Sequence, residues 1–502
     1  MKILLVIPSR SYGNMPGYTK FPDEMLSIGG MLESRGHEIR LIDCNLDKNS
    51  QPADFVEFAP ELIGFGVATG PNIASALSQS AEYKKLLPGV KIVWGFRHAS
   101  AYPAEVLAEP CIDYAIIGAG EFTIAELAEY LQNGTCEIAS IKGLAYKDSQ
   151  GNAVINEARS FMPDLDSLPD PAWHLIDVKK YSDVTLNTSR GCPYKCTFCS
   201  DTSFWGGQMC DLSAERIVSQ MEILHKEYGI QHIYFSGERF VINRERLKEF
   251  CNLVIAKKWK LTWNAPVSGG IDEETVKLMA KSGCTSVLLE IETGSQRMLT
   301  FLDKGTVAEM ESTFWFLVKH RIIPTIFMYY GYPTETVADF KESLDLLKRL
   351  DDPPYLYMKF VPYPSTRLFD YCVEQGLLAQ PKNLMEWVDF PLRCANEMNL
   401  SAVPQKAMDE AMASFRRSYA TRRVRFMLRH NPAFFLMAIK RPGEFFRSIC
   451  DLGKYYIDIM MDQTNSSDSW MYKLFKKMGW VGNKSSKQSE EVKAVTRGGE
   501  VR

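Results

Sequence analysis

Short, largely apolar runs alternate with helical patterns over residues 1–140 of the chain. Most of these runs lack the strict polar alternation of a half-buried strand, which indicates strands buried on both faces. Buried strands separated by helices predict an α/β fold with an open, doubly wound parallel sheet. The strand candidates are Lys2–Ile7, Glu38–Asp43, Glu61–Val67, Lys91–Trp94 and Asp113–Ile117.

The turns after three of these strands hold small residues. Thr69-Gly70-Pro71 follows the third run, Gly95 the fourth, and Gly118-Ala119-Gly120-Glu121 the fifth. Glycine lets the backbone approach a large ligand, and ligands of parallel sheets bind at the carboxyl ends of the strands. Taken singly, each turn is equally compatible with an ordinary connection between a strand and a helix.

A hairpin and a linker are predicted over residues 141–180. Strand-like sequence from Gly143 to Asn156 flanks the turn Asp148–Asn152, which is typical of a hairpin. Pro163, Pro169 and Pro171 then interrupt a polar stretch, as in a linker.

A second series of strands and helices occupies residues 181–390. Six strand-helix units in succession predict a partial (β/α)6 barrel, whose chemistry is expected at the carboxyl ends of its strands. The strand candidates are Val184–Thr188, Gln231–Phe235, Lys260–Asn264, Ser286–Ile291, Ile322–Tyr330 and Tyr355–Val361.

Residues 391–483 are predicted to be helical and basic, and residues 484–502 to be a disordered tail. Between Phe415 and Arg447 nine basic residues stand against one acid, Glu444, with phenylalanines between them. Such a stretch can lie on an anionic membrane surface or bind a lipid-like substrate. The pattern favours a helical cap on the barrel, with its arginines solvated or paired with barrel carboxylates.

Composition and charge narrow the function classes. The 502 residues include 58 Lys and Arg against 61 Asp and Glu, a net charge of −3, so no overall basic excess indicates a nucleic-acid partner. The apolar run Leu4–Ile7 is too short for a signal peptide, and no stretch reaches the ~18 apolar residues of a membrane span. Most of the 12 cysteines stand alone, which is typical of a reducing compartment. We therefore expect a cytoplasmic protein.

Three cysteines form a motif directly after the first barrel strand. Cys192, Cys196 and Cys199 have the spacing Cys-x3-Cys-x2-Cys, with Phe198 just before the third cysteine. Three thiolates on one short loop can bind three irons of a [4Fe-4S] cluster and leave the fourth iron open for a small ligand.

A structural zinc site is the main alternative for this motif. Such a site requires a fourth protein ligand, usually in a nearby pair. Cys210 is a candidate fourth ligand, whereas His225 and His232 do not have the spacing of a zinc-binding histidine pair. No partner pair follows the motif, which favours the iron-sulfur interpretation.

The cysteine motif, its position and the six strand-helix units resemble the radical S-adenosylmethionine (radical SAM) superfamily. The resemblance covers roughly residues 183–365. It implies that the open iron binds the amino and carboxylate groups of SAM. An electron from the cluster would then cleave a carbon-sulfur bond and release a 5′-deoxyadenosyl radical.

The same resemblance implies SAM contacts. Ser236-Gly237-Glu238 stands where the family has Gly-Gly-Glu, which binds the SAM amino group, although only one glycine is retained here. Glu290, Glu292 and Ser295 stand where the family contacts the ribose, and Gly331–Glu335 resembles the Gly-x-Pro-x-Glu segment near adenine. A solvated helix start is the alternative for each acidic residue. The implied SAM-binding residues are Phe198, Gly237, Glu238, Glu290, Glu292, Ser295, Gly331 and Glu335.

The N-terminal domain is similar to the Rossmann-like cobalamin-binding domain of cobalamin-dependent radical SAM enzymes. The matching segments are Thr69–Ile73, Val93–His98, Asp113–Glu121 and Leu168–Trp173. The motif Asp-x-His-x-x-Gly, which supplies a cobalt ligand in mutases, is absent, so His98 is expected near the corrin or as a turn histidine without binding cobalt. The implied cobalamin contacts are Thr69, Gly70, Pro71, Gly95, His98, Gly118, Gly120 and Glu121.

The resemblance implies a cobalamin-dependent C-methyltransferase that acts on a weakly nucleophilic centre of a small-molecule or lipid-like substrate. A reductant protein such as flavodoxin or ferredoxin would supply electrons, and peripheral membrane contact stays open. One alternative is a cobalamin-dependent cyclase or rearrangement enzyme that transfers no methyl group. Another is a radical SAM enzyme whose N-terminal domain only binds a partner. The sequence identifies no catalytic residue and no substrate.

Overall fold

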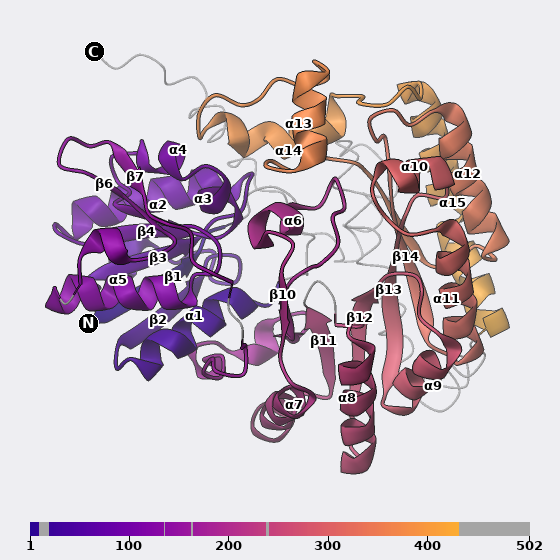
Figure 1. The fold of residues 1–502 in the computed structure, drawn as a ribbon, viewed down its shortest axis with the longest axis horizontal. Coiled ribbons are helices and arrows are strands. Elements are labelled where there is room, and N and C mark those ends of the chain that lie inside the picture. The colour runs from indigo at the N-terminus through magenta and orange to yellow at the C-terminus, as the bar shows by residue number, and fades with distance from the viewer. Residues whose placement is uncertain (10–19, 135, 162–163, 237–239, 431–502) are drawn as a thin grey trace, which may run out of the picture. The chain divides into compact units, whose positions relative to one another are not determined.

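The computed structural model describes residues 1–9, 20–134, 136–161, 164–236 and 240–430 (Figure 1). Within them, a seven-stranded sheet has the order β2-β1-β3-β4-β5-β6-β7. Strands β1 to β5 pair in parallel, as predicted, and their order is that of a doubly wound sheet with a switch point between β1 and β3. The bounds are β1 Lys2–Ile7, β2 Glu38–Asp43, β3 Leu62–Gly66, β4 Lys91–Gly95, β5 Tyr114–Ile116, β6 Leu144–Lys147 and β7 Ala153–Ile155.

The predicted hairpin is present, but it extends this sheet instead of standing apart from it. Its strands β6 and β7 add to the edge strand β5 in antiparallel fashion. This pairing satisfies backbone groups that β5 would otherwise expose at an open edge. The helices of this domain are α1 Asp23–Ser34, α2 Asn72–Leu86, α3 Arg97–Ala101, α4 Pro103–Leu107 and α5 Glu121–Asn133.

The barrel strands form a six-stranded parallel sheet in the order β15-β14-β13-β12-β11-β8. Because β8 and β15 do not pair, the sheet is an incomplete barrel, as the sequence predicts. Burial alternates along β12 and β14, as expected for strands with distinct inner and outer faces. The bounds are β8 Thr185–Asn187, β11 His232–Ser236, β12 Thr262–Val267, β13 Cys284–Glu292, β14 Ile323–Tyr330 and β15 Tyr355–Lys359.

The barrel helices follow their strands in regular order. Several begin at side-chain caps; for example, α11 and α12 start with capping boxes at Thr306 and Thr336. The bounds are α7 Ala214–Tyr228, α8 Arg244–Lys257, α9 Glu273–Lys281, α10 Gln296–Phe301, α11 Val307–Lys319 and α12 Val337–Arg349.

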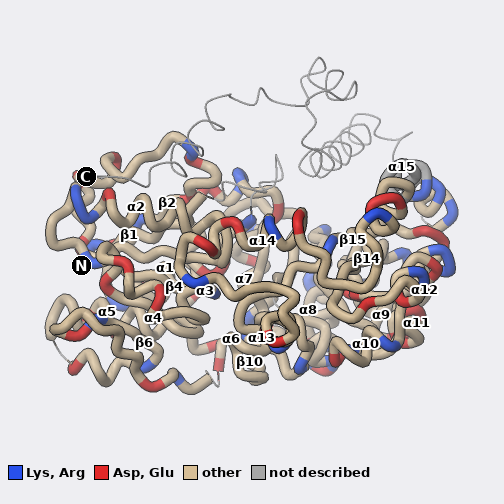
Figure 2. The backbone as a smooth tube through the Cα atoms, turned by 90° about the horizontal axis from the view of Figure 1, so that it is seen from above, with Lys and Arg blue, Asp and Glu red and all other residues tan. Residues whose placement is uncertain are grey.

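The C-terminal helices are α13 Arg367–Glu374, α14 Glu386–Asn396 and α15 Gln405–His430. Arg422 of α15 forms an ion pair of 2.7 Å with Asp352, and His430 lies 2.8 Å from Asp351. Figure 2 shows basic positions along α15 and a mixture of both signs elsewhere. These contacts support the capping role for the described part of the basic region. Residues 431–502, with the rest of that region and the predicted tail, lie outside the described residues.

No helix among the described residues is both long enough and apolar enough to cross a membrane.

Candidate active site

The three motif cysteines lie on one loop at the carboxyl end of the first barrel strand. Cys192 and Cys196 are buried, and Cys199 is half-buried at the N-cap of α6 (Ser200–Trp205). The loop leaves β9 (Ser189–Gly191), which pairs with β10 (Met209–Asp211). Gly191 is required there, because its φ is +80° and a Cβ would lie 2.0 Å from the Gln208 carbonyl oxygen.

Backbone hydrogen bonds fix the cysteine loop to the barrel. The Thr197 N–H donates to the Leu302 carbonyl at 3.0 Å, and the Leu368 N–H donates to the Thr197 carbonyl at 2.9 Å. No described cysteine is joined in a disulfide. Among the described residues, no group of three or more His, Cys, Asp or Glu side chains is placed to hold a single metal ion. A [4Fe-4S] cluster has a different requirement, because its thiolates bind separate irons.

Buried polar atoms without partners stand just before the cysteine loop. Within the part of the chain that the structure describes, Asn187 Oδ1, Thr188 Oγ1 and Ser189 Oγ accept or donate no hydrogen bond. Buried polar atoms are otherwise almost always paired, and leaving one unpaired destabilises a fold by about 1–3 kcal/mol. Three such atoms in succession, from the end of β8 to the start of β9, therefore fit a bound polar ligand next to the cluster loop.

Two of the predicted SAM-binding carboxylates share a buried lysine. Lys304 Nζ lies 2.5 Å from Glu292 Oε1 and 3.9 Å from Glu290 Oε2, at the end of β13. It also lies 5.9 Å from the centre of the Phe198 ring, within the cysteine motif. Glu292 has a φ of +71° at an irregularity of the strand, a strained conformation of the kind that clusters at functional sites.

Sequence reasoning missed Lys304, because a single lysine after a helix carries no spacing signal. The structure adds it to the predicted set, together with its two carboxylates.

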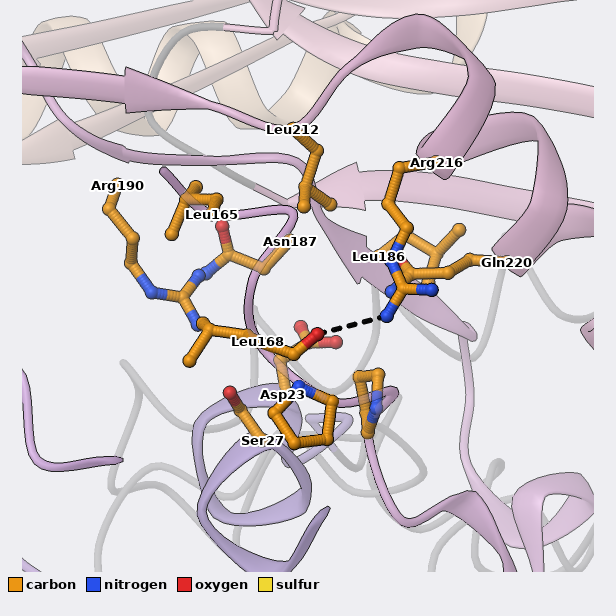
Figure 3. Close-up of a pocket in the computed structure, with 12 residues that line it drawn as sticks. Asp23, Ser27, Leu165, Leu168, Leu186, Asn187, Arg190, Leu212, Arg216 and Gln220 are labelled. Carbon is orange, nitrogen blue, oxygen red and sulfur yellow. Dashed lines mark hydrogen bonds between the residues drawn. The ribbon is translucent and has the colours of Figure 1, made fainter. Parts of the chain in front are cut away.

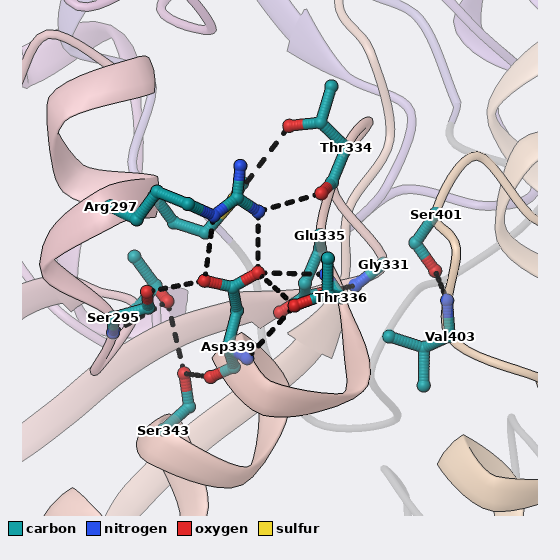
Figure 4. A network of polar contacts seen from close by, with 12 residues as sticks. Ser295, Arg297, Gly331, Thr334, Glu335, Thr336, Asp339, Ser343, Ser401 and Val403 are labelled. Carbon is teal, nitrogen blue, oxygen red and sulfur yellow. Dashed lines mark hydrogen bonds and ion pairs between the residues drawn. The ribbon is translucent and has the colours of Figure 1, made fainter.

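The segment Gly331–Glu335, which is predicted to lie near adenine, is held by a network of polar contacts (Figure 4). The fully buried Glu335 accepts a hydrogen bond of 2.5 Å from the Gly331 N–H, and burial raises its pKa to about 7. Ser295 donates to Asp339 at 2.6 Å. Burial acts to raise the pKa of Asp339, but hydrogen bonds from Arg297 and its neighbours lower it. Glu335 and Ser295 thus brace loops at this end of the barrel.

The third SAM segment is only partly described, since Gly237 and Glu238 lie outside the described residues. Ser236, which precedes them at the end of β11, donates a 2.8 Å hydrogen bond to Asp23 of α1. Thr185 of β8 donates to the same carboxylate oxygen. Burial, and then the nearby Glu24, raises the pKa of Asp23 to about 6. Asp23 lines a small pocket, together with Arg190 and Asn187 (Figure 3), and the volume of this pocket is about 30 Å³.

A cavity of about 840 Å³ lies where the sheet and the cluster loop meet. One wall is the Ile117-Gly118-Ala119 turn after β5, and another is α6, directly after Cys199. Phe204 and Trp205 of α6 give it aromatic surface, and Tyr363–Ser365 after β15 line it as well. The cavity thus adjoins the carboxyl ends of strands from both sheets, which is where both folds bind ligands.

The predicted cobalamin residues do not all line this cavity. Gly118 does, whereas His98 is fully buried, with Nδ1 3.1 Å from Thr69 Oγ1 and its ring against Trp387 of α14. A Cβ at Gly70 would lie 3.3 Å from Pro391, also in α14. The C-terminal helix α14 therefore covers the turn after β3. This contact could not be predicted from the sequence, because α14 and the turn are far apart along the chain, with the whole barrel between them.

The remaining members of that set lie nearby. Pro71 forms the N-cap of α2, and a Cβ at Gly95 or Gly120 would contact Ile116. Glu121, the first residue of α5, turns toward the barrel and forms an ion pair with Arg190. These assignments stay predictions.

A doubly wound sheet followed by an incomplete parallel barrel, with three cysteines after its first strand, defines the radical SAM class joined to a corrinoid-type domain. Family models agree: the B12 binding domain matches residues 18–128, and the radical SAM superfamily matches residues 186–347. The chain is a radical SAM enzyme with an N-terminal B12-binding domain.

The relatives that this chain matches have different named activities. An uncharacterized methyltransferase of Pyrococcus horikoshii is 29% identical, over 75% of this chain and 84% of that one. The anaerobic magnesium-protoporphyrin IX monomethyl ester cyclase of Rubrivivax gelatinosus is 24% identical, over 74% of this chain and 69% of that one. The radical SAM methyltransferase TsrM from Kitasatospora setae, solved with cobalamin and a [4Fe-4S] cluster, has a TM-score of 0.65 and 18% identity, covering 76% of each chain. At that identity the likeness to TsrM shows the fold.

Proposed function

We propose that the protein is a cobalamin-dependent radical SAM methyltransferase that methylates a weakly nucleophilic carbon of a small molecule. The observation that carries the proposal is the cavity of about 840 Å³, whose walls include both a strand-end turn of the B12-binding domain and the helix after Cys199. Methyl transfer to carbon by this route requires both cofactors beside one substrate position, and this cavity adjoins both predicted cofactor sites.

The residues present fit the three cofactors. Cys192, Cys196 and Cys199 would hold the [4Fe-4S] cluster, and the unpaired atoms of Asn187, Thr188 and Ser189 offer polar contacts beside it. The predicted cobalamin site is the sheet edge around Gly118. When bound, the three cofactors supply a 5′-deoxyadenosyl radical and a transferable methyl group.

The chain itself contributes position and exclusion of water. Lys304, with only 5% of its side chain exposed, holds Glu290 and Glu292 in place at the end of β13, so that these carboxylates can orient SAM hydroxyl groups. The buried Glu335 fixes the turn at Gly331. The aromatic side chains of α6 keep water from the substrate position, which protects a reactive radical from side reactions.

A second candidate is ring formation or rearrangement without methyl transfer. The likeness to the Rubrivivax cyclase favours it, because that relative is 24% identical over 74% of this chain. The third possibility, an N-terminal domain that only recruits a partner, has less support, because the B12 binding domain model matches residues 18–128. Electrons would come from a reductant protein such as flavodoxin or ferredoxin, and the unpaired cysteine pattern fits the reducing cytoplasm.

The test uses full-length protein purified without oxygen and reconstituted with iron, sulfide and hydroxocobalamin. With SAM and dithionite, a methyltransferase is expected to form both 5′-deoxyadenosine and S-adenosylhomocysteine, the latter only when cobalamin is present. A cyclase would form 5′-deoxyadenosine alone. Failure of the protein to retain any corrinoid would overturn the cobalamin part of the proposal, and Cys192→Ala serves as the control without a cluster.

A further inference from the structure

The cluster loop is held at both ends by ion pairs from the B12-binding domain. Arg190, two residues before Cys192, pairs with Glu121 at 3.2 Å, and their side chains are only 10% and 6% exposed. Asp201, two residues after Cys199, pairs with Arg97 of α3. These two ion pairs, Glu121–Arg190 and Arg97–Asp201, are called the loop clamp below.

The two residues that the B12-binding domain contributes to the loop clamp lie at the carboxyl edge of its sheet. Glu121 begins α5 after β5, and Arg97 begins α3 after β4, so both stand at turns of the edge where a parallel sheet binds its ligand. Both arginines also line the cavity of about 840 Å³. A ligand that shifts either turn therefore acts directly on a charge that holds the cluster loop.

The geometry of the clamp is tightly determined. The two ion pairs have opposite orientations, because the N-terminal domain supplies the acid, Glu121, in one pair and the base, Arg97, in the other. Glu121 also accepts a 3.0 Å hydrogen bond from Ser27, and the Arg97 guanidinium lies 4.5 Å from the centre of the Phe204 ring in α6. The buried Glu121–Arg190 pair tolerates little displacement, because breaking it leaves an uncompensated charge, and the Arg97–Asp201 pair is half-buried.

We propose that the loop clamp couples the two cofactor sites, so that occupation of the sheet edge by a corrinoid and binding of SAM at the cluster change each other's affinity. The proposal rests on the proposed function. It makes Arg97, Glu121, Arg190 and Asp201 positioning residues, which act through the loop and not by contact with reacting atoms. Because coupling between binding sites is reciprocal, it can be measured from either side.

The experiment titrates hydroxocobalamin into full-length, cluster-loaded protein by absorbance, with and without saturating SAM. The wild type is expected to show a change in corrinoid Kd of about fivefold or more, the lower range of coupling between sites. In Asp201→Asn and Arg190→Gln, at unchanged iron content, the change is expected to fall below about twofold. The exchanged pair Arg97→Asp with Asp201→Arg should regain coupling, because it restores opposite charges at the same positions.

Arg35→Gln is the matched control, since it removes an ion pair of 2.8 Å with Glu129 that is exposed and remote from the cluster loop. It should leave the SAM effect intact. A variant that loses iron is replaced by its charge-retaining counterpart, Asp201→Glu or Arg190→Lys, which should keep the coupling. A wild-type corrinoid affinity that is the same with and without SAM would overturn the clamp and leave the proposed function standing. Absence of corrinoid binding altogether would instead overturn the proposed function.

Discussion

The Ser236 hydroxyl donates a 2.8 Å hydrogen bond to Asp23 Oδ2, which joins the first helix of the B12-binding domain to the second strand of the barrel. The two residues are 213 positions apart. Ser236 directly precedes Gly237 and Glu238, the predicted contacts of the SAM amino group. A carboxylate of one domain thus supports the strand end that leads into a cofactor segment of the other.

This carboxylate should make stability depend on pH. Burial raises the pKa of Asp23 in the folded protein to about 6, from 3.8 in the unfolded chain. Folding therefore favours the neutral form of this carboxyl group. Its contribution to the free energy of unfolding is fully present below pH 3.8 and is lost as the pH rises through about 6. The side chain in Asp23→Asn stays neutral at every pH. Between pH 4.5 and 7 the free energy of unfolding of the wild type should therefore fall by about 2 kcal/mol relative to that of the variant.

The measurement is urea unfolding of both proteins at several pH values, followed by tryptophan fluorescence. Asn is the matched replacement, because its side-chain oxygen can still accept from Ser236 and Thr185. A difference between the two proteins that does not vary with pH would show that Asp23 keeps an ordinary pKa.

Replacement of any motif cysteine should abolish cluster assembly. Cys192→Ala, Cys196→Ala and Cys199→Ala are each expected to lose iron and all 5′-deoxyadenosine formation, because each thiolate is expected to bind a separate iron of the cluster. Cys136→Ala is the control, since this half-buried thiol lies outside the motif. Iron analysis and product chromatography decide the matter, and a triple alanine variant with a normal cluster would refute the assignment.

The strand pattern could be predicted from sequence because burial on both faces leaves a local signal. β1 and β2 have the predicted bounds, Lys2–Ile7 and Glu38–Asp43, and the other predicted strands differ by one to three residues at their ends. The place of the hairpin could not be predicted, because its turn residues determine that it forms but not which edge it joins.

Contacts between distant segments leave no such signal. Arg190 and Glu121 are 69 residues apart, and each would be expected at the surface when its own segment is considered alone. The cover of Gly70 by Pro391 is of the same kind. The sequence could therefore predict the cysteine loop, whose ligands are local, but not the pairs that hold it.

Removal of the charge on Lys304 should weaken SAM binding. Lys304→Met removes the cation that lies 2.5 Å from Glu292 Oε1 and 3.9 Å from Glu290 Oε2, so repulsion between the two carboxylates should increase and shift them at the end of β13. We expect the Kd for SAM to rise about tenfold, equivalent to about 1.4 kcal/mol, with iron content unchanged. Equilibrium binding of labelled SAM measures the change.

Lys319→Met is the matched control, because it removes an exposed ion pair with Glu273 on the outside of the barrel. Equal SAM affinities of the Lys304 variant and the wild type would show that this lysine does not contribute to SAM binding.

Gly70 and Gly118, both predicted cobalamin contacts, should respond differently to replacement by leucine. A Cβ at Gly118 meets no heavy atom within 4 Å and points into open space at the cavity, so Gly118→Leu should lower corrinoid affinity, although its φ of +76° adds local strain. Gly70→Leu should instead lower the melting temperature, because its side chain would collide with Pro391. Spectroscopic corrinoid titration and thermal unfolding separate the two effects, and the opposite pattern would reverse the assignment of the two turns.

His98 is not expected to bind cobalt. Its side chain is fully buried against Tyr102 and Trp387, and burial lowers its pKa to about 4, so the imidazole is neutral at pH 7. A neutral imidazole could bind cobalt through Nε2, which has no hydrogen-bond partner among the described residues, but the side chain is fully buried and its ring is packed beneath α14. We therefore expect His98→Ala to keep a corrinoid spectrum without an imidazole ligand, and to reduce the melting temperature through loss of packing. Electron paramagnetic resonance of the cob(II)alamin form tests this directly: nitrogen superhyperfine splitting in the wild type that disappears in His98→Ala would show that His98 binds cobalt.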